Sequence, residues 1–168
     1  MMLKPRMALR YFGRWFLGAF GLLSLGFAVV AAEPSDAAVR RLTAQSKPAP
    51  GVVFEIVSAN EAGLERAIPL VTRHARELRK RFPELPIAVV THGREMFALQ
   101  ADRRAEREAV HSGVEALKKD AIPVHVCETY AGMRGLSAEA FPAYVDVAPS
   151  GPSQIKSYLE LGYILIRI

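Results

Sequence analysis

The sequence predicts an α/β protein with three layers, α/β/α, in which helices cover both faces of a mainly parallel, five-stranded sheet. Two observations support this prediction. Short runs of apolar, often β-branched residues recur along the chain, and segments with helical spacing of apolar residues separate them. Strands that are apolar throughout are typical of parallel sheets that are buried on both faces.

Five segments are expected to be strands, and helical segments lie between them. The expected strands are residues 52–58, 87–91, 122–127, 144–149 and 163–168. The longest expected helix has one apolar stripe, spaced four or three residues apart: Leu64, Ile68, Val71, Ala75, Leu78 and Phe82. His74 and His111 flank the apolar stripes of their helices, and we expect both of them at the surface.

The first 32 residues have the features of an export signal. Lys4, Arg6, Arg10 and Arg14 precede an uncharged apolar run, which ends in the small residues Val-Val-Ala-Ala. This pattern predicts secretion, cleavage after Ala32 and a periplasmic mature protein. The alternative is an uncleaved N-terminal membrane anchor, because the apolar run is just long enough to span a bilayer.

The remaining charge is nearly balanced, which bears on the class of partner. Four of the 22 basic residues and none of the 17 acidic residues lie in residues 1–32, so residues 33–168 carry 18 basic against 17 acidic residues. The net charge of +5 therefore gives no indication of nucleic-acid binding. Residues 33–51 are rich in Pro, Ala and Ser and are interpreted as a linker, and residues 52–168 as the folded domain.

Cys127 is the only cysteine in the chain, and it ends the third expected strand. A single thiol cannot form an internal disulfide, so an exported protein buries it, pairs it with another chain or uses it chemically. Free cysteine often only packs in the core. A helical turn beginning near Thr129 or Ala131 would bring backbone N–H groups to the sulfur, and Arg134 or His92 could add positive charge.

Functional residues of open α/β sheets gather at the carboxyl ends of the strands. This rule selects three places: Ser58–Glu61, Thr91–Gly93 and Cys127–Arg134. If the strands that precede these segments are neighbours in the sheet, their side chains converge on one edge. A metal site formed by His92, His125 and Cys127 is an alternative, although the sequence lacks a Cys-x-x-Cys or His-x-x-x-His pair.

Four stretches of the chain together resemble the DsrE/DsrF-like family, which includes sulfur-relay subunits and other small oligomeric proteins. They are "FEIVSANEAGLERAIPLV", "VVTHGREMFAL", "GVEALKKDAIPVHVCETYAGMRGL" and "VDVAPSGPSQIKSYLELGYILIRI", and they span about residues 52–168. The resemblance implies a three-layer domain that assembles into homo-trimers or hexamers. It also implies that Cys127 lies where sulfur-relay members carry a persulfide, and that His92 lies at the His-Gly position of the family.

We therefore expect an exported sulfur-handling protein in which Cys127 accepts or carries sulfane sulfur. His92 and Arg134 would steady the thiolate, and Thr91, Gly93, Glu128 and Tyr130 would line the site. The expected partners are a sulfur donor or acceptor protein or a small sulfur compound, with no cofactor and no metal. The alternative is a non-catalytic oligomeric module of the same fold that binds a ligand or partner at this edge.

Overall fold

The computed structural model describes residues 33–168, so the predicted export signal or anchor lies outside the described residues. The sheet has five strands, all parallel, in the order β4-β3-β2-β1-β5. The strands are β1 Val52–Ile56, β2 Ile87–Thr91, β3 Val124–Cys127, β4 Asp146–Ala148 and β5 Ile164–Arg167. The predicted α/β class and parallel sheet are confirmed.

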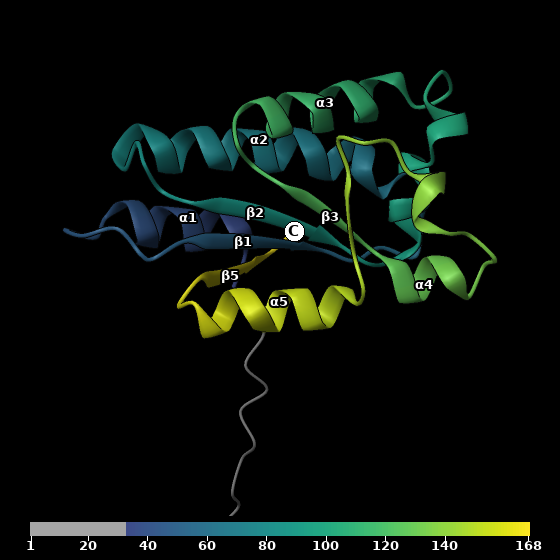
Figure 1. The fold of residues 1–168 in the computed structure, drawn as a ribbon. Coiled ribbons are helices and arrows are strands. Elements are labelled where there is room, and N and C mark those ends of the chain that lie inside the picture. The colour runs from purple at the N-terminus through teal and green to yellow at the C-terminus, as the bar shows by residue number, and fades with distance from the viewer. Residues whose placement is uncertain (1–32) are drawn as a thin grey trace, which may run out of the picture. The chain divides into compact units, whose positions relative to one another are not determined.

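Helices cover the two faces of the sheet unequally (Figure 1). The α-helices are α1 Ser35–Thr43, α2 Gly63–Arg81, α3 Glu108–Lys119, α4 Glu128–Gly132 and α5 Gly151–Glu160. Short 3₁₀ helices lie at η1 Arg94–Leu99, η2 Ala101–Arg103 and η3 Ala138–Ala140. The first three α-helices pack on one face and α5 packs on the other, so the sheet is the middle of three layers.

The alternation of side chains along each strand divides the core into two parts. Along β1, Val52, Phe54 and Ile56 belong to the larger core under α1, α2 and α3. Val53 points to the opposite face, where it packs with Ile155 of α5 in a smaller core. The apolar runs of the sequence are therefore strands buried on both sides, as predicted.

Residues 33–51 differ from the linker that composition predicts. Residues Ser35–Thr43 form α1, whose Ala38, Val39 and Leu42 are buried against the core shared with α2. Helix α1 packs on the domain because these three residues lie on one side of it. Burial stabilises a side chain as large as Val39 or Leu42 by about 1.5–3 kcal/mol. The folded domain therefore includes α1 and does not begin at Val52.

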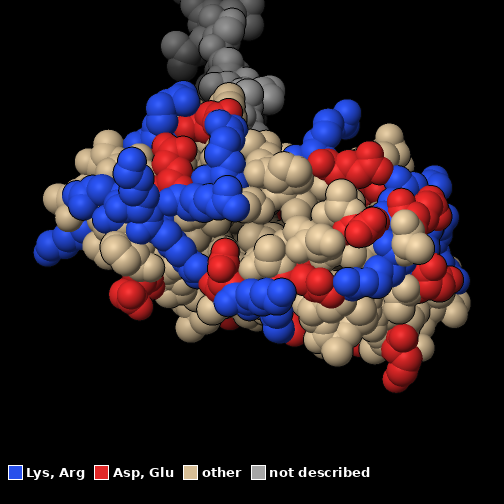
Figure 2. Space-filling view, turned by 90° about the horizontal axis from the view of Figure 1, so that it is seen from above, with Lys and Arg blue, Asp and Glu red and all other residues tan. Residues whose placement is uncertain are grey.

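Charged side chains cover the outer surface of the helical layer (Figure 2). Lys and Arg gather toward one end of this view, and the last turns of α1 and α2 contain five of them: Arg40, Arg41, Arg79, Lys80 and Arg81. Positive charge near a helix C-terminus is favoured by the helix dipole. Among residues 33–168, none of the helices is both long enough and apolar enough to span a bilayer.

Candidate functional site

The strand order brings the three predicted segments to one edge of the sheet. Strands β1, β2 and β3 are neighbours, and their register pairs Ile56 with Thr91 and Thr91 with Val126. The segments that follow these three strands begin at Val57, His92 and Glu128, and they therefore leave the sheet side by side. The predicted convergence is confirmed at the level of the backbone.

Glu95, which no local sequence pattern indicates, fixes the loops after β1 and β2. Its carboxylate is fully buried and accepts three hydrogen bonds. The Ser58 N–H donates to Oε2 at 2.6 Å, while the Thr91 hydroxyl and the Gly93 N–H donate to Oε1 at 2.6 and 2.9 Å. Thr91 and Gly93 therefore hold the edge together and are not free to bind a ligand through these groups.

Gly93 has a second reason to be glycine, which is the close approach of its neighbours. A Cβ atom at this position would lie 2.4 Å from Oε2 of Glu95 and 2.7 Å from the backbone nitrogen of Ser58. Real Cβ atoms do not come so close, and both neighbours are held by the hydrogen bonds just described. The His-Gly pair of the sequence thus makes room for the buried carboxylate.

Cys127 is the last residue of β3 and the N-cap of α4. Its Sγ accepts a hydrogen bond from the Tyr130 N–H at 3.4 Å, so the sulfur takes the place that an oxygen usually has at a helix start. The residue is 5% exposed and belongs to the larger core. Glu128 and Thr129, which follow it, are exposed. The thiol is therefore almost covered, and an amide donor contacts it from α4.

Tyr130 and Arg134 both contact Phe97 of η1. The rings of Tyr130 and Phe97 are 5.2 Å apart at their centroids, and Cζ of Arg134 lies 4.5 Å from the centroid of the Phe97 ring. Arg134 also forms an ion pair with Glu61 at 3.5 Å. It therefore links the segment after β3 to the loop after β1.

Glu61 is the common partner of three arginines at this edge. Arg103 lies 2.6 Å from its carboxylate, Arg134 3.5 Å and Arg94 3.9 Å. The hydrogen bond from Arg103, assisted by Arg134, lowers the pKa of Glu61 below its ordinary value although partial burial opposes this. Because Glu61 already partners Arg134, this arginine is drawn toward the β1 loop.

His92 turns to the α5 side of the sheet. Its Nε2–H donates to Oε1 of Glu55 at 3.0 Å, and the other oxygen of Glu55 accepts from Arg167 at 2.8 Å. Gly151 at the start of α5 lies so close that an added Cβ would be 2.5 Å from Cβ of His92. Within residues 33–168, neither His92 nor Arg134 forms a hydrogen bond with Cys127. The hydrogen bond of His92 and the ion pair of Arg134 are made with Glu55 and Glu61 instead.

The alternative metal site is not assembled in the part of the chain that the structure describes. His125 forms a hydrogen bond with the Tyr158 hydroxyl at 2.8 Å, and His92 bonds to Glu55. Among residues 33–168, no group of three or more His, Cys, Asp or Glu side chains lies close enough together to hold a metal ion.

Comparisons with known proteins identify the fold. Models of protein families give no match, and curated protein sequences give none. Several solved structures are similar, and three of them follow. MTH1491 of Methanobacterium thermoautotrophicum, a protein of unknown function, has a TM-score of 0.56 at 23% identity over 70% of this chain and 97% of its own. The ychN protein of E. coli has a TM-score of 0.53 at 14% identity, covering 70% and 99% of the two chains. BT1422 of Bacteroides thetaiotaomicron, also of unknown function, has a TM-score of 0.50 at 14% identity, covering 69% and 94%. The chain thus shares its α/β fold with these three structures.

Proposed function

We propose that the protein is an exported sulfur-handling protein in which Cys127 accepts sulfane sulfur and carries it as a persulfide. The observation that carries the proposal is the position of Sγ. The sulfur lies at the carboxyl end of β3, where the Tyr130 N–H donates a hydrogen bond to it. An N–H group that points at a sulfur stabilises the thiolate, which is the nucleophilic form. The resemblance of the surrounding segments to sulfur-relay proteins supports the same reading.

The proposed step moves one sulfur atom without a change of oxidation state overall. The Cys127 thiolate attacks the outer sulfur of a donor persulfide, R–S–SH. A new bond forms between Sγ and that sulfur, the S–S bond of the donor breaks, and the donor leaves as the thiolate R–S⁻. The product is Cys127–S–SH, and the sulfur passes to an acceptor thiolate by the same exchange in reverse. No cofactor or metal takes part in this exchange.

Intact-mass spectrometry of the folded protein tests this proposal. After incubation with inorganic polysulfide, the wild type should gain the mass of one sulfur atom, and dithiothreitol should remove it. The Cys127→Ser variant should gain none, and its circular dichroism should match that of the wild type because serine can cap α4 in place of the sulfur. A wild type that stays unmodified, although its thiol reacts after denaturation, would contradict the proposal.

The 5% exposure of Cys127 favours a second candidate, a non-catalytic oligomeric module that binds a ligand or partner at the same edge. In that case Cys127 only packs, and a thiol reagent reacts with it only in the unfolded protein.

The oligomer, a homo-trimer or hexamer, is part of both proposals. Light scattering coupled to size exclusion tests it, and a mass equal to that of one chain would contradict it.

A further inference from the structure

A pocket of about 390 Å³ opens at the carboxyl ends of β1 and β5, beside the first turns of α2. Its volume lies in the range of about 300–1,000 Å³ that small-molecule sites have. The pocket includes Ser58, which begins Ser58–Glu61, one of the three segments expected at the carboxyl ends of the strands. Cys127 lies on β3, which β2 separates from β1. The pocket is therefore distinct from the proposed sulfur site and does not depend on it.

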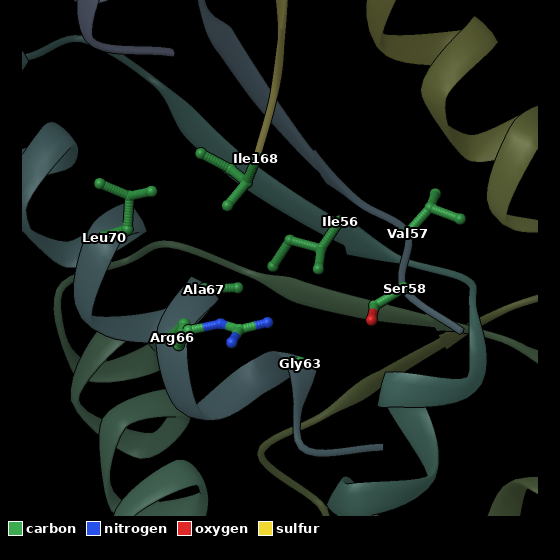
Figure 3. A pocket seen from close by; sticks show the side chains of 8 residues that line it. All are labelled: Ile56, Val57, Ser58, Gly63, Arg66, Ala67, Leu70 and Ile168. Atoms are coloured by element: carbon green, nitrogen blue, oxygen red, sulfur yellow. The ribbon is translucent and has the colours of Figure 1, made fainter. Parts of the chain in front are cut away.

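The walls of the pocket are apolar. Five aliphatic residues line it, and the side chains of Ile56, Ala67, Leu70 and Ile168 lie around the space, whereas that of Val57 points away from it (Figure 3). A ligand with an apolar part would remove this surface from water, which is favourable.

Two hydrogen-bond donors face the same space, and neither has an acceptor there. Arg66 extends from α2 into the space near Ile56 and Ser58 (Figure 3). Across residues 33–168, Arg66 forms no ion pair and no hydrogen bond, whereas Arg94, Arg103 and Arg134 at the same edge all pair with Glu61. A guanidinium group without a carboxylate beside an apolar pocket is suited to an anionic ligand.

Ser58 supplies the second donor, and its position is fixed. Its Oγ accepts a hydrogen bond from the Asn60 N–H at 3.0 Å, and its hydroxyl hydrogen has no acceptor in the described part of the chain. Its backbone is held on both sides, because its N–H donates to Glu95 and its carbonyl accepts from the Arg94 N–H at 2.8 Å. Gly63 allows α2 to approach, since a Cβ there would lie 2.8 Å from Cβ of Ser58.

We propose that this pocket binds a small organic acid, a carboxylate with a short aliphatic tail. The carboxylate would accept two hydrogen bonds from the fork of Arg66 and one from the Ser58 hydroxyl. The tail would lie against Ile56, Ala67 and Leu70. The pocket offers a guanidinium group and a hydroxyl beside aliphatic walls, and this combination favours an anionic ligand with an apolar part over a cation.

Hexanoate is a suitable probe, and NMR of the methyl groups of Ile, Leu and Val reports where it binds. In the wild-type protein, titration with hexanoate should shift the methyl signals of Ile56, Leu70 and Ile168 along saturable curves. Hexanamide has the same tail without the charge, and it should bind more weakly by about tenfold or more, because a hydrogen bond to a charged group contributes that much.

Two matched variants separate this site from general attraction to a basic surface. Arg66→Met keeps the aliphatic stem and the helix propensity but removes the charge, and it should weaken hexanoate binding by about tenfold or more. Lys80→Met removes one exposed cation from the last turn of the same helix, far from the pocket, and should leave the affinity within about twofold of the wild type. Equal affinities of the wild type and Arg66→Met, equal affinities for hexanoate and hexanamide, or shifts that map elsewhere would each overturn the proposal.

Discussion

Glu95 is the residue on which the carboxyl edge of the sheet most directly depends, since three donors from two loops meet on its buried carboxylate. Glu95→Ala leaves these donors unsatisfied and opens a cavity, and each unsatisfied buried group costs about 1–3 kcal/mol. We expect the free energy of unfolding, measured with urea, to fall by about 3 kcal/mol or more. Glu95→Gln keeps an oxygen for Thr91 and Gly93 and should lose less. Equal losses for the two variants would contradict this account.

His111 gives the folded protein a pH dependence. It is fully buried, its Nε2–H donates to the Ala98 carbonyl, and the Tyr144 hydroxyl donates to Nδ1, so the ring is neutral. Burial is the main cause that lowers its pKa below the ordinary 6.5. The unfolded chain binds a proton more readily, so His111 contributes stability that is present above pH 6.5 and is lost as the pH falls toward its folded value.

The corresponding measurement compares the free energy of unfolding at pH 7.5 and pH 5.5. The wild type should be less stable at the lower pH, and His111→Gln should show a smaller decrease than the wild type. His74 and His125 also have pKa values lowered mainly by burial, so the variant retains part of the dependence. An unchanged pH dependence in His111→Gln would show that His111 does not titrate in this way.

His74 and His111 show what residue-level sequence reasoning missed, because both were expected at the surface and both are buried. His74 lies three residues after Val71 and four before Leu78, and His111 lies three before Val114, so both share the inward side of their helices. The helical spacing was therefore a usable signal, but the polar character of histidine directed the prediction to the surface. Each ring has a hydrogen-bond partner on a distant segment, such as Ser35 Oγ at 3.1 Å from Nε2 of His74, although Nδ1 of His74 has no partner within residues 33–168. Such partners come from distant segments, which no local pattern reveals.

At the scale of elements, α1 is a part of the fold that the sequence did not predict. Its packing rests on Ala38, Val39 and Leu42, and the last of these is 3% exposed. Leu42→Ala should lower the free energy of unfolding by about 2–4 kcal/mol, as large-to-small changes in a core do. Arg41→Ala changes an exposed neighbour in the same turn and should have a small effect. Equal, small effects in both variants would mean that α1 does not pack on α2 in solution.

The strands and long helices could be predicted because their signals are local. Strands β1, β2 and β3 lie in mainly apolar runs, and α2 carries an apolar stripe between Leu64 and Leu78. The buried role of Glu95 could not be predicted, since only the pairing of β1 with β2 brings Ser58 to its carboxylate. The same holds for His92, which the sequence placed beside Cys127 but which Glu55 of β1 orients toward α5. Geometry at a sheet edge depends on which strands are neighbours, and one sequence does not encode that locally.

At the scale of the whole molecule, the predicted export signal has a direct test. If the chain is cleaved after Ala32, the protein isolated from a periplasmic fraction should begin at Glu33, two residues before α1. Mass spectrometry of the intact mature protein and of its N-terminal peptide identifies the first residue. A protein recovered with residues 1–32 attached, in the membrane fraction, would support the uncleaved anchor instead.

The central claim is that the thiol of Cys127 can be reached by a small reagent and can react in the folded protein, although only 5% of the residue is exposed. The most direct measurement is the reaction of iodoacetamide with the native protein, followed by intact mass, with and without prior treatment with polysulfide. If the claim holds, iodoacetamide alkylates Sγ at one site without denaturant. After treatment with polysulfide, the added sulfur protects Sγ itself from alkylation, and a reductant removes that sulfur. A native thiol that is inert to both reagents, and that reacts fully only in urea, would contradict it.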